Sequence, residues 1–172
     1  MKSSTGSGLF FLAAGAALFF LAVKDSFGAD DSVSDFSSGG LSNLQKDYIG
    51  KYYNMAKQTE QYYAVPAPVT LAQGILESAA GTSNLAVNAN NHFGIKADSS
   101  WNGPTYNGYR KYSSAGNSFI DHAKFLTMNP RYSAAFDTTD PVAFIQAVAA
   151  AGYAGDPLYA QKIIGLFRDM SA

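Results

Sequence analysis

The pattern of apolar and polar residues divides the chain into three parts. Residues 9–23 read LFFLAAGAALFFLAV and carry no charge, whereas residues 24–40 are rich in Ser, Asp and Gly. From Leu41 onwards, apolar residues recur at spacings of three and four, which predicts amphipathic helices. We therefore expect an N-terminal signal anchor or signal peptide at residues 1–23, a flexible linker at residues 24–40 and one folded domain at residues 41–172.

The first helix of the domain is predicted over Leu41–Tyr63. Ser42 with Gln45 three residues later forms a capping box, which is typical of a helix N-terminus. The residues expected on its buried face are Leu44, Tyr48, Ile49, Tyr52, Met55 and Ala56. Pro68 is expected to open the next helix, because the first helical turn does not need the N–H that proline lacks.

The remainder of the chain predicts a mainly α (α+β) domain with a small β element. Ser83 caps a short helix to about Val87, Asn117 caps a helix to Met128, and Asp140 and Asp156 begin the last two helices. The residues expected to point inward from these helices are Phe119, Ile120, Ala123 and Leu126, then Tyr159, Ile163, Leu166 and Phe167. Two short strands are predicted at residues 93–96 and 109–112, with a turn at residues 101–104.

The stretch PVTLAQGILESAAG, residues 68–81, is the most informative part of the chain. Ala72, Ile75, Leu76 and Ala79 form a core-facing stripe at helical spacing, and Glu77 lies off that stripe. The small residues around Glu77 leave room for a large ligand. On this stretch alone, a solvated surface glutamate is the favoured interpretation.

Charge and composition exclude several classes of function. The chain has 12 Lys and Arg against 13 Asp and Glu, a balance that argues against a dedicated nucleic-acid binder. It has no cysteine and two isolated histidines, so neither a disulfide framework nor a metal site is expected. We expect no cofactor.

Five ordered motifs resemble the glucosaminidase domain of glycoside hydrolase family 73, which is found among autolysins, flagellar hydrolases and phage lysins. They read AQGILESAAGTSNLA, NNHFGIK, YRKY, NPRY and GYAGDPLYA, and the similarity runs from about Leu44 to Met170. The resemblance implies a lysozyme-like fold with a β-hairpin lobe. It also implies an endo-β-N-acetylglucosaminidase that cuts the β-1,4 bond after N-acetylglucosamine in peptidoglycan glycan strands.

The resemblance places the catalytic acid on Glu77 and puts Tyr153 in the cleft near it. Glycosidic cleavage needs an acid that keeps its proton near neutral pH, so a partly apolar environment is expected around Glu77. The chain has only one other glutamate, Glu60, which reads as a solvated helix residue. Tyr159 is expected to be a packing residue.

The second catalytic group is where the chain departs from the family. Many members carry another carboxylate in the β element, but residues 97–108 contain only Asp98. Either Asp98 acts in catalysis, or it is a turn aspartate and the acetamido group of the substrate acts as the internal nucleophile. A lytic transglycosylase, a muramidase and a non-catalytic wall-binding module remain alternatives.

Substrate contacts are expected from residues near Glu77 and from aromatic residues of the β element. The expected contacts are Gln73, Asn91, His92 and Phe93 along the cleft, and Trp101, Tyr106 and Tyr109 as sugar-stacking rings. His92 is read as a polar cleft wall rather than a general base, and His122 as structural.

The N-terminal segment indicates export. Lys2 precedes it and Asp25, Asp30 and Asp31 follow it, which favours a cytoplasmic N-terminus. Cleavage after Gly28 is the alternative to a retained anchor, and we expect retention. The predicted partners are glycan strands and the membrane, with the domain in the cell envelope, or on a virion if the source is a phage. We expect a monomer, although no feature of the sequence determines the oligomeric state.

Overall fold

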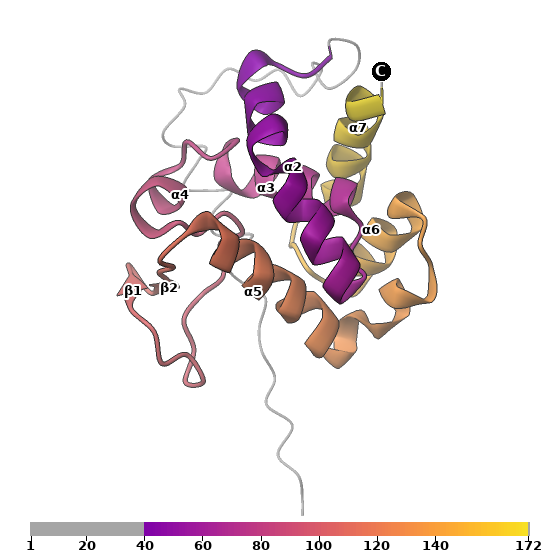
Figure 1. The fold of residues 1–172 in the computed structure, drawn as a ribbon. Coiled ribbons are helices and arrows are strands. Elements are labelled where there is room, and N and C mark those ends of the chain that lie inside the picture. Colours follow the sequence, from indigo (N-terminus) through magenta and orange to yellow (C-terminus); the bar gives the residue numbers. More distant parts are fainter. Residues whose placement is uncertain (1–39, 172) are drawn as a thin grey trace, which may run out of the picture.

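The structure, a computed structural model, describes residues 40–171. The expected N-terminal segment and all but the last residue of the expected linker lie outside these residues. The helices are α2 (Asn43–Tyr63), α3 (Ala67–Ser78), α4 (Asn84–Ala89), α5 (Ala115–Met128), the 3-10 helix η1 (Pro130–Asp137), α6 (Pro141–Ala150) and α7 (Tyr159–Ser171) (Figure 1). Across residues 40–171, we find no helix that combines the length and apolar character needed to span a membrane.

Helix α3 lies at the centre of the domain. It packs against α2, α6 and α7, and ten of its 12 residues are buried. The expected stripe therefore understates its burial, because neighbouring helices cover nearly its whole circumference. Pro66 precedes the helix and Pro68 lies in its first turn, as the sequence predicted to within one residue.

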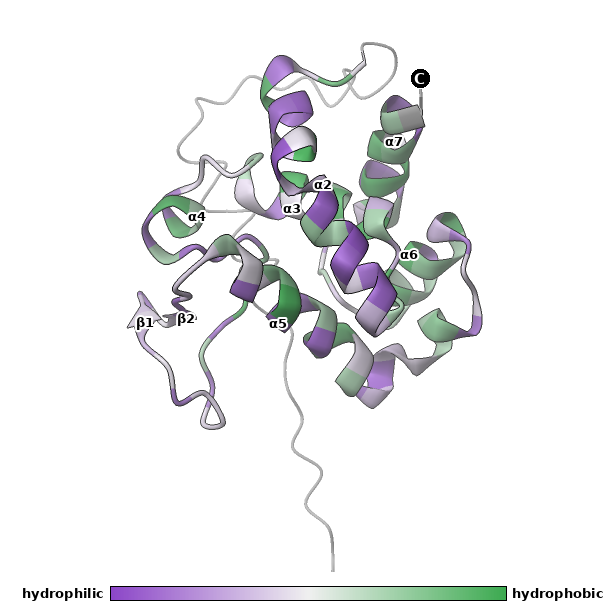
Figure 2. Ribbon diagram, viewed as in Figure 1, coloured by the Kyte–Doolittle hydropathy of each residue, from purple (hydrophilic) through white to green (hydrophobic). Residues whose placement is uncertain are grey.

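Helix α2 confirms the predicted capping box at Ser42 and Gln45. Its ribbon alternates purple and green in Figure 2, as expected for an amphipathic helix. Tyr48, Tyr52 and Ala56 are buried, but Leu44, which we expected to be inward, is 47% exposed. Leu44 lies in the first turn of the helix, and the buried face begins one turn later at Tyr48.

The later helices follow the predicted caps closely. Ser83 and Asp140 cap α4 and α6, and all four expected core residues of α7 are buried. Helix α5 begins earlier than predicted, because Ser114 caps it and accepts the backbone N–H of Asn117. Ile120 is 39% exposed, contrary to expectation, since its neighbour Phe119 occupies the inner face.

The β element differs from the prediction. Strands β1 (Thr105–Tyr106) and β2 (Tyr109–Arg110) form an antiparallel hairpin in which Tyr106 pairs with Tyr109. The turn is Asn107-Gly108, and both residues are left-handed with φ of +49° and +81°. Asn-Gly between two strands is a strong hairpin signal, and the hairpin turn lies there rather than at the predicted residues 101–104. The predicted strand at residues 93–96 contributes only a single bridge, from Lys96 to Tyr109.

Candidate active site

Glu77 is the penultimate residue of α3 and is only 6% exposed. Burial disfavours the charged carboxylate and raises the pKa of Glu77 to about 7, while a hydrogen bond from Tyr159 acts in the opposite direction. The interpretation of Glu77 as a solvated surface glutamate is therefore wrong. A carboxylic acid with this pKa holds its proton for a useful fraction of the time near neutral pH, as a general acid must.

A chain of two hydrogen bonds leads to Glu77 from inside the protein. The hydroxyl of Tyr159, at the start of α7, donates to Oε1 of Glu77 at 3.1 Å. The Nε2 atom of Gln73, one turn before Glu77 on α3, donates to the Tyr159 oxygen at 2.8 Å. Tyr159, expected only to pack, contacts the acid directly. Gln73, expected to contact sugar, is fully buried and donates to Tyr159, so its contact with sugar stays a prediction.

Tyr153 lies beside this chain of hydrogen bonds. Its ring stacks on that of Tyr159 with centroids 5.5 Å apart, and further aromatic contacts come from Tyr132 and His122. Burial raises the pKa of Tyr153 well above its usual range, and the nearby charge of Glu77 raises it further. The structure thus places Tyr153 close to the acid, while its catalytic role stays a prediction.

The end of α3 is shaped by small residues. Ala79, Ala80 and Gly81 adopt left-handed conformations with φ of +49°, +51° and +82°. Such conformations cost L-residues roughly 1–2 kcal/mol each, a cost that Ala79 and Ala80 carry and that Gly81 avoids. The Ser78 hydroxyl accepts the N–H of Gly81 at 2.7 Å and so holds the turn directly after Glu77.

Asn91, His92 and Phe93 are buried in this structure, and their expected contact with sugar along the cleft stays a prediction. The Nδ2 atom of Asn91 donates to the carbonyls of Ile95 at 2.9 Å and Arg110 at 2.8 Å, which ties this loop to the hairpin. These bonds use both amide hydrogens of Asn91, so neither is left for a sugar in this conformation.

The two histidines are also internal. Nδ1 of His92 lies 3.1 Å from the hydroxyl of Tyr48, and burial lowers the pKa of His92 to about 4, with Lys51 adding to the effect. His122 stacks on Phe93 with centroids 3.9 Å apart, and both of its ring nitrogens are buried without a hydrogen-bond partner. The structural role expected for His122 agrees with this placement.

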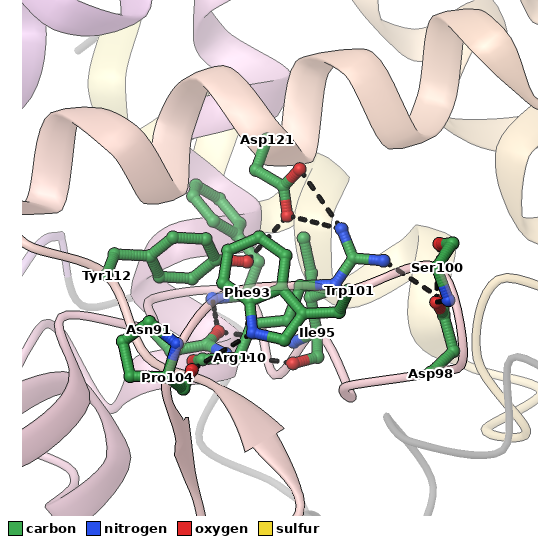
Figure 3. Close-up of polar contacts among 10 residues, drawn as sticks. All are labelled: Asn91, Phe93, Ile95, Asp98, Ser100, Trp101, Pro104, Arg110, Tyr112 and Asp121. Carbon is green, nitrogen blue, oxygen red and sulfur yellow. Dashed lines mark hydrogen bonds and ion pairs between the residues drawn. The ribbon is translucent and has the colours of Figure 1, made fainter.

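Asp98 belongs to an ion-pair network on the hairpin side of the domain. The Arg110 guanidinium lies between Asp98 and Asp121, and Tyr112 donates to the same Asp121 carboxylate at 2.6 Å (Figure 3). Asp98 also accepts the backbone N–H of Ser100 at 2.8 Å, in the turn geometry that the sequence predicts for a local aspartate.

The three aromatic residues proposed for sugar stacking have different surroundings. Nε1 of Trp101 donates to the Pro104 carbonyl at 3.0 Å, and Arg110 lies over its ring at 4.9 Å. The hydroxyl of Tyr106 donates to Asn84 at 3.0 Å, whereas Tyr109 is half-buried in the second strand. Trp101 also borders a hollow of about 360 Å³ between α5 and the two segments that flank the hairpin, so a ligand contact there stays a prediction. Within residues 40–171, no three side chains are arranged to hold a metal ion.

Comparison with known proteins decides the family. A sequence model described as mannosyl-glycoprotein endo-beta-N-acetylglucosaminidase matches residues 53–172. The chain belongs to this glucosaminidase family. The chain is 34% identical to peptidoglycan hydrolase FlgJ of Salmonella typhimurium over 160 residues, which cover 80% of the chain and 50% of the relative. Exo-glucosaminidase LytG of Bacillus subtilis is 32% identical over 123 residues, with 60% of the chain and 43% of that protein covered. The chain thus spans half or less of the length of these relatives.

Solved structures confirm the lysozyme-like glycoside hydrolase fold with a small hairpin. The glycoside hydrolase domain of Salmonella typhimurium FlgJ superposes with a TM-score of 0.65 at 33% identity, over 74% of this chain and 88% of that one. A peptidoglycan hydrolase from Sphingomonas sp. A1 superposes with a TM-score of 0.62 at 32% identity, over 71% and 86% of the two chains.

Proposed function

We propose that this glucosaminidase is a peptidoglycan hydrolase with Glu77 as its general acid. The observation that carries the proposal is the burial of Glu77, which raises its pKa to about 7. The names of the FlgJ relatives support peptidoglycan as the substrate. The bond we expect to be cut is the β-1,4 bond after N-acetylglucosamine, in an endo-acting reaction.

Protonated Glu77 donates its proton to the glycosidic oxygen as the bond from that oxygen to C1 breaks. Positive charge develops on C1 and the ring oxygen, in the manner general to glycoside hydrolysis. Water then adds to C1 and returns one proton to Glu77, so the enzyme is restored and one water molecule is consumed. The buried setting of Glu77 strengthens electrostatic interactions during the first step.

The charge at C1 needs a second group, and we assign this work to the acetamido group of the substrate or to Tyr153. Asp98, the remaining candidate, is engaged by Arg110 at 3.0 Å and by Ser100. Substrate-assisted glycosidases use the acetamido oxygen in this way, so no enzymatic carboxylate has to act as the nucleophile. The proximity of Tyr153 to Glu77 supports a phenol that orients the acetamido group.

The ion pair between Asp98 and Arg110, which leaves Glu77 as the one available carboxyl group of the two candidates, makes a lytic transglycosylase the second candidate. Such an enzyme needs one glutamic acid and forms an anhydro product, because a hydroxyl of the sugar itself attacks C1 instead of water. The engagement of Asp98 by Arg110 is compatible with either route.

Mass spectrometry of muropeptides released by the purified full-length protein tests the proposal. Reducing N-acetylglucosamine ends are the expected products. Anhydro ends would assign the chain to the transglycosylases, and reducing N-acetylmuramic acid ends would make it a muramidase. Failure to release products from several peptidoglycan types would indicate a wall-binding module without turnover.

We further propose that residues 1–23 anchor the domain of residues 41–172 to a membrane through the linker at residues 24–40. The uncharged run of residues 9–23 supports an anchor, although it is slightly shorter than the roughly 17–25 residues of a spanning helix. The mature protein should fractionate with membranes and retain this run. N-terminal sequencing that begins near Ala29 would show cleavage instead.

A further inference from the structure

We infer that the hydrogen bonds from Gln73 through Tyr159 to Glu77 run in one direction and place the transferable proton of the acid on Oε2. In this arrangement Gln73 and Tyr159 are positioning residues. The inference rests on the proposed role of Glu77 as general acid, and it adds which oxygen delivers the proton and what selects that oxygen.

The direction follows from what each group can donate. The Nε2 amide group of Gln73 can only donate, and it lies 2.8 Å from the Tyr159 oxygen. The single hydroxyl hydrogen of Tyr159 is therefore free to point at Oε1 of Glu77, 3.1 Å away. If the Gln73 amide were flipped, its oxygen would compete for that same hydrogen and Glu77 would lose its donor.

This direction decides which oxygen of Glu77 is protonated. A proton on Oε1 that pointed at Tyr159 would displace the hydroxyl hydrogen of Tyr159 from the 3.1 Å gap between the two oxygens. The hydroxyl hydrogen of Tyr159 would then lose its acceptor on Glu77, which is costly for a buried polar group. Oε1 therefore stays an acceptor, and the proton occupies Oε2, the oxygen that is not bonded to Tyr159.

The protein holds this chain of hydrogen bonds rigidly. Gln73, Tyr159 and Glu77 are 0%, 3% and 6% exposed, so water competes little for their hydrogen bonds. Gln73 and Glu77 are one helical turn apart on α3, and α7 packs directly against α3. The ring of Tyr153 stacks on that of Tyr159 at an interplanar angle of 30°, which restricts its rotation.

The groups around Glu77 leave Tyr159 as the side chain that governs its protonation. Glu77 accepts the hydrogen bond from Tyr159 of α7. The neutral phenol of Tyr153, in the segment between α6 and α7, also lies near Glu77. The two causes that act on the pKa of Glu77 are burial, which raises it, and Tyr159, which lowers it.

The chain offers an unusually direct test, because it contains only two glutamates, Glu60 and Glu77. Full-length protein grown with glutamate labelled at the side-chain carboxyl carbon gives two signals to follow by NMR during a pH titration. In Tyr159→Phe the Glu77 signal should titrate near pH 8 instead of about 7, since a hydrogen bond to the charged form has been removed. The Glu60 signal is the internal comparison, because the bonds of Glu60 run to Lys57 and Ala67 and do not involve Tyr159.

Kinetics supply the second readout. In Tyr159→Phe we expect kcat to fall about tenfold with KM little changed, and the alkaline limb of the pH profile to move upward by about one pH unit. Tyr132→Phe is the matched control. It removes another buried hydroxyl near Tyr153 that makes no hydrogen bond to Glu77, and it should leave rate and profile unchanged. A structural loss alone would lower the rate without moving the profile.

Gln73→Met repeats the test at the start of the chain of hydrogen bonds, and it decides the question if Tyr159→Phe fails to fold. The substitution keeps a long unbranched side chain and removes the donor to Tyr159, so the Glu77 signal should move in the same direction by a smaller amount. Unchanged titration of Glu77 in folded Tyr159→Phe or Gln73→Met would overturn the inference. An active Glu77→Gln variant would instead overturn the proposed function while leaving the titration result intact.

Discussion

Nη2 of Arg110 lies 3.0 Å from Oδ2 of Asp98, so the only carboxylate of residues 97–108 is committed to an ion pair. Burial by itself would raise the pKa of Asp98, but the bonds from Ser100 and the charge of Arg110 hold that pKa below its ordinary value. Asp98 is therefore ionised near neutral pH and cannot act as a proton donor there. To act as a nucleophile or base, it would first have to leave Arg110.

We accordingly expect Asp98→Asn to lower turnover of purified peptidoglycan by less than about tenfold, which is under about 1.4 kcal/mol of barrier. Tyr153→Phe should lower turnover more, because it removes the hydroxyl beside Glu77 and keeps the ring that stacks on Tyr159. Initial rates of both variants under one set of conditions give the comparison. The reverse order would show that Asp98 reaches the reacting bond.

Glu77→Gln should abolish most activity, because the amide keeps the shape of the side chain and has no proton to donate. General-acid catalysis contributes about 100- to 10,000-fold, so a loss in this range is expected. Binding to insoluble peptidoglycan, measured by co-sedimentation, should persist. A variant that retains a near-normal rate would remove Glu77 from the mechanism.

The same substitution should change how stability depends on pH. The folded protein raises the pKa of Glu77 from an ordinary 4.5 to about 7. The stability that the protonated group contributes is complete below about pH 4.5 and is lost as pH rises through about 7. Between pH 4.5 and 8.5, urea unfolding should therefore show the wild type losing up to about 3 kcal/mol relative to Glu77→Gln. Parallel curves for the two proteins would contradict the burial argument.

Gly74→Ala should destabilise the domain. A β-carbon on Gly74 would overlap the hydroxyl of Tyr48, which cannot easily move because it is bonded to His92. Overpacking of this kind costs about 1–3 kcal/mol. Gly50→Ala is the matched control, since nothing lies near its β-position, and an alanine within α2 should stabilise by about 0.5–1 kcal/mol. Thermal unfolding of the two variants should therefore shift in opposite directions.

His122→Phe should make the domain less sensitive to acid. Burial lowers the pKa of His122 from 6.5 to about 3, so the stability linked to its neutral form is present above pH 6.5 and is lost as pH falls towards 3. Phenylalanine can keep the stacking contact with Phe93 without a buried nitrogen that must be protonated. Unfolding at pH 4 and pH 7 should show a smaller difference for the variant. An equal difference in both proteins would mean that His122 does not contribute.

The sequence by itself determined the features that depend on neighbouring residues. Ser42, Ser83 and Asp140 cap helices within one turn of their own position, so local spacing was enough to predict them. The turn at Asn107-Gly108 is equally local and was available in the sequence, although we placed the turn elsewhere. The family motifs were also sufficient to single out Glu77 and Tyr153.

Only the tertiary structure decided what surrounds Glu77. Tyr159 donates to it from 82 residues away, and no periodicity within α3 or α7 indicates that their ends meet at that point. The burial of Asn91 and His92 was likewise decided by partners on the hairpin and on α2. Hydrogen bonds depend on positions to within fractions of an ångström, and those positions are set by how helices pack rather than by the residues of either helix alone.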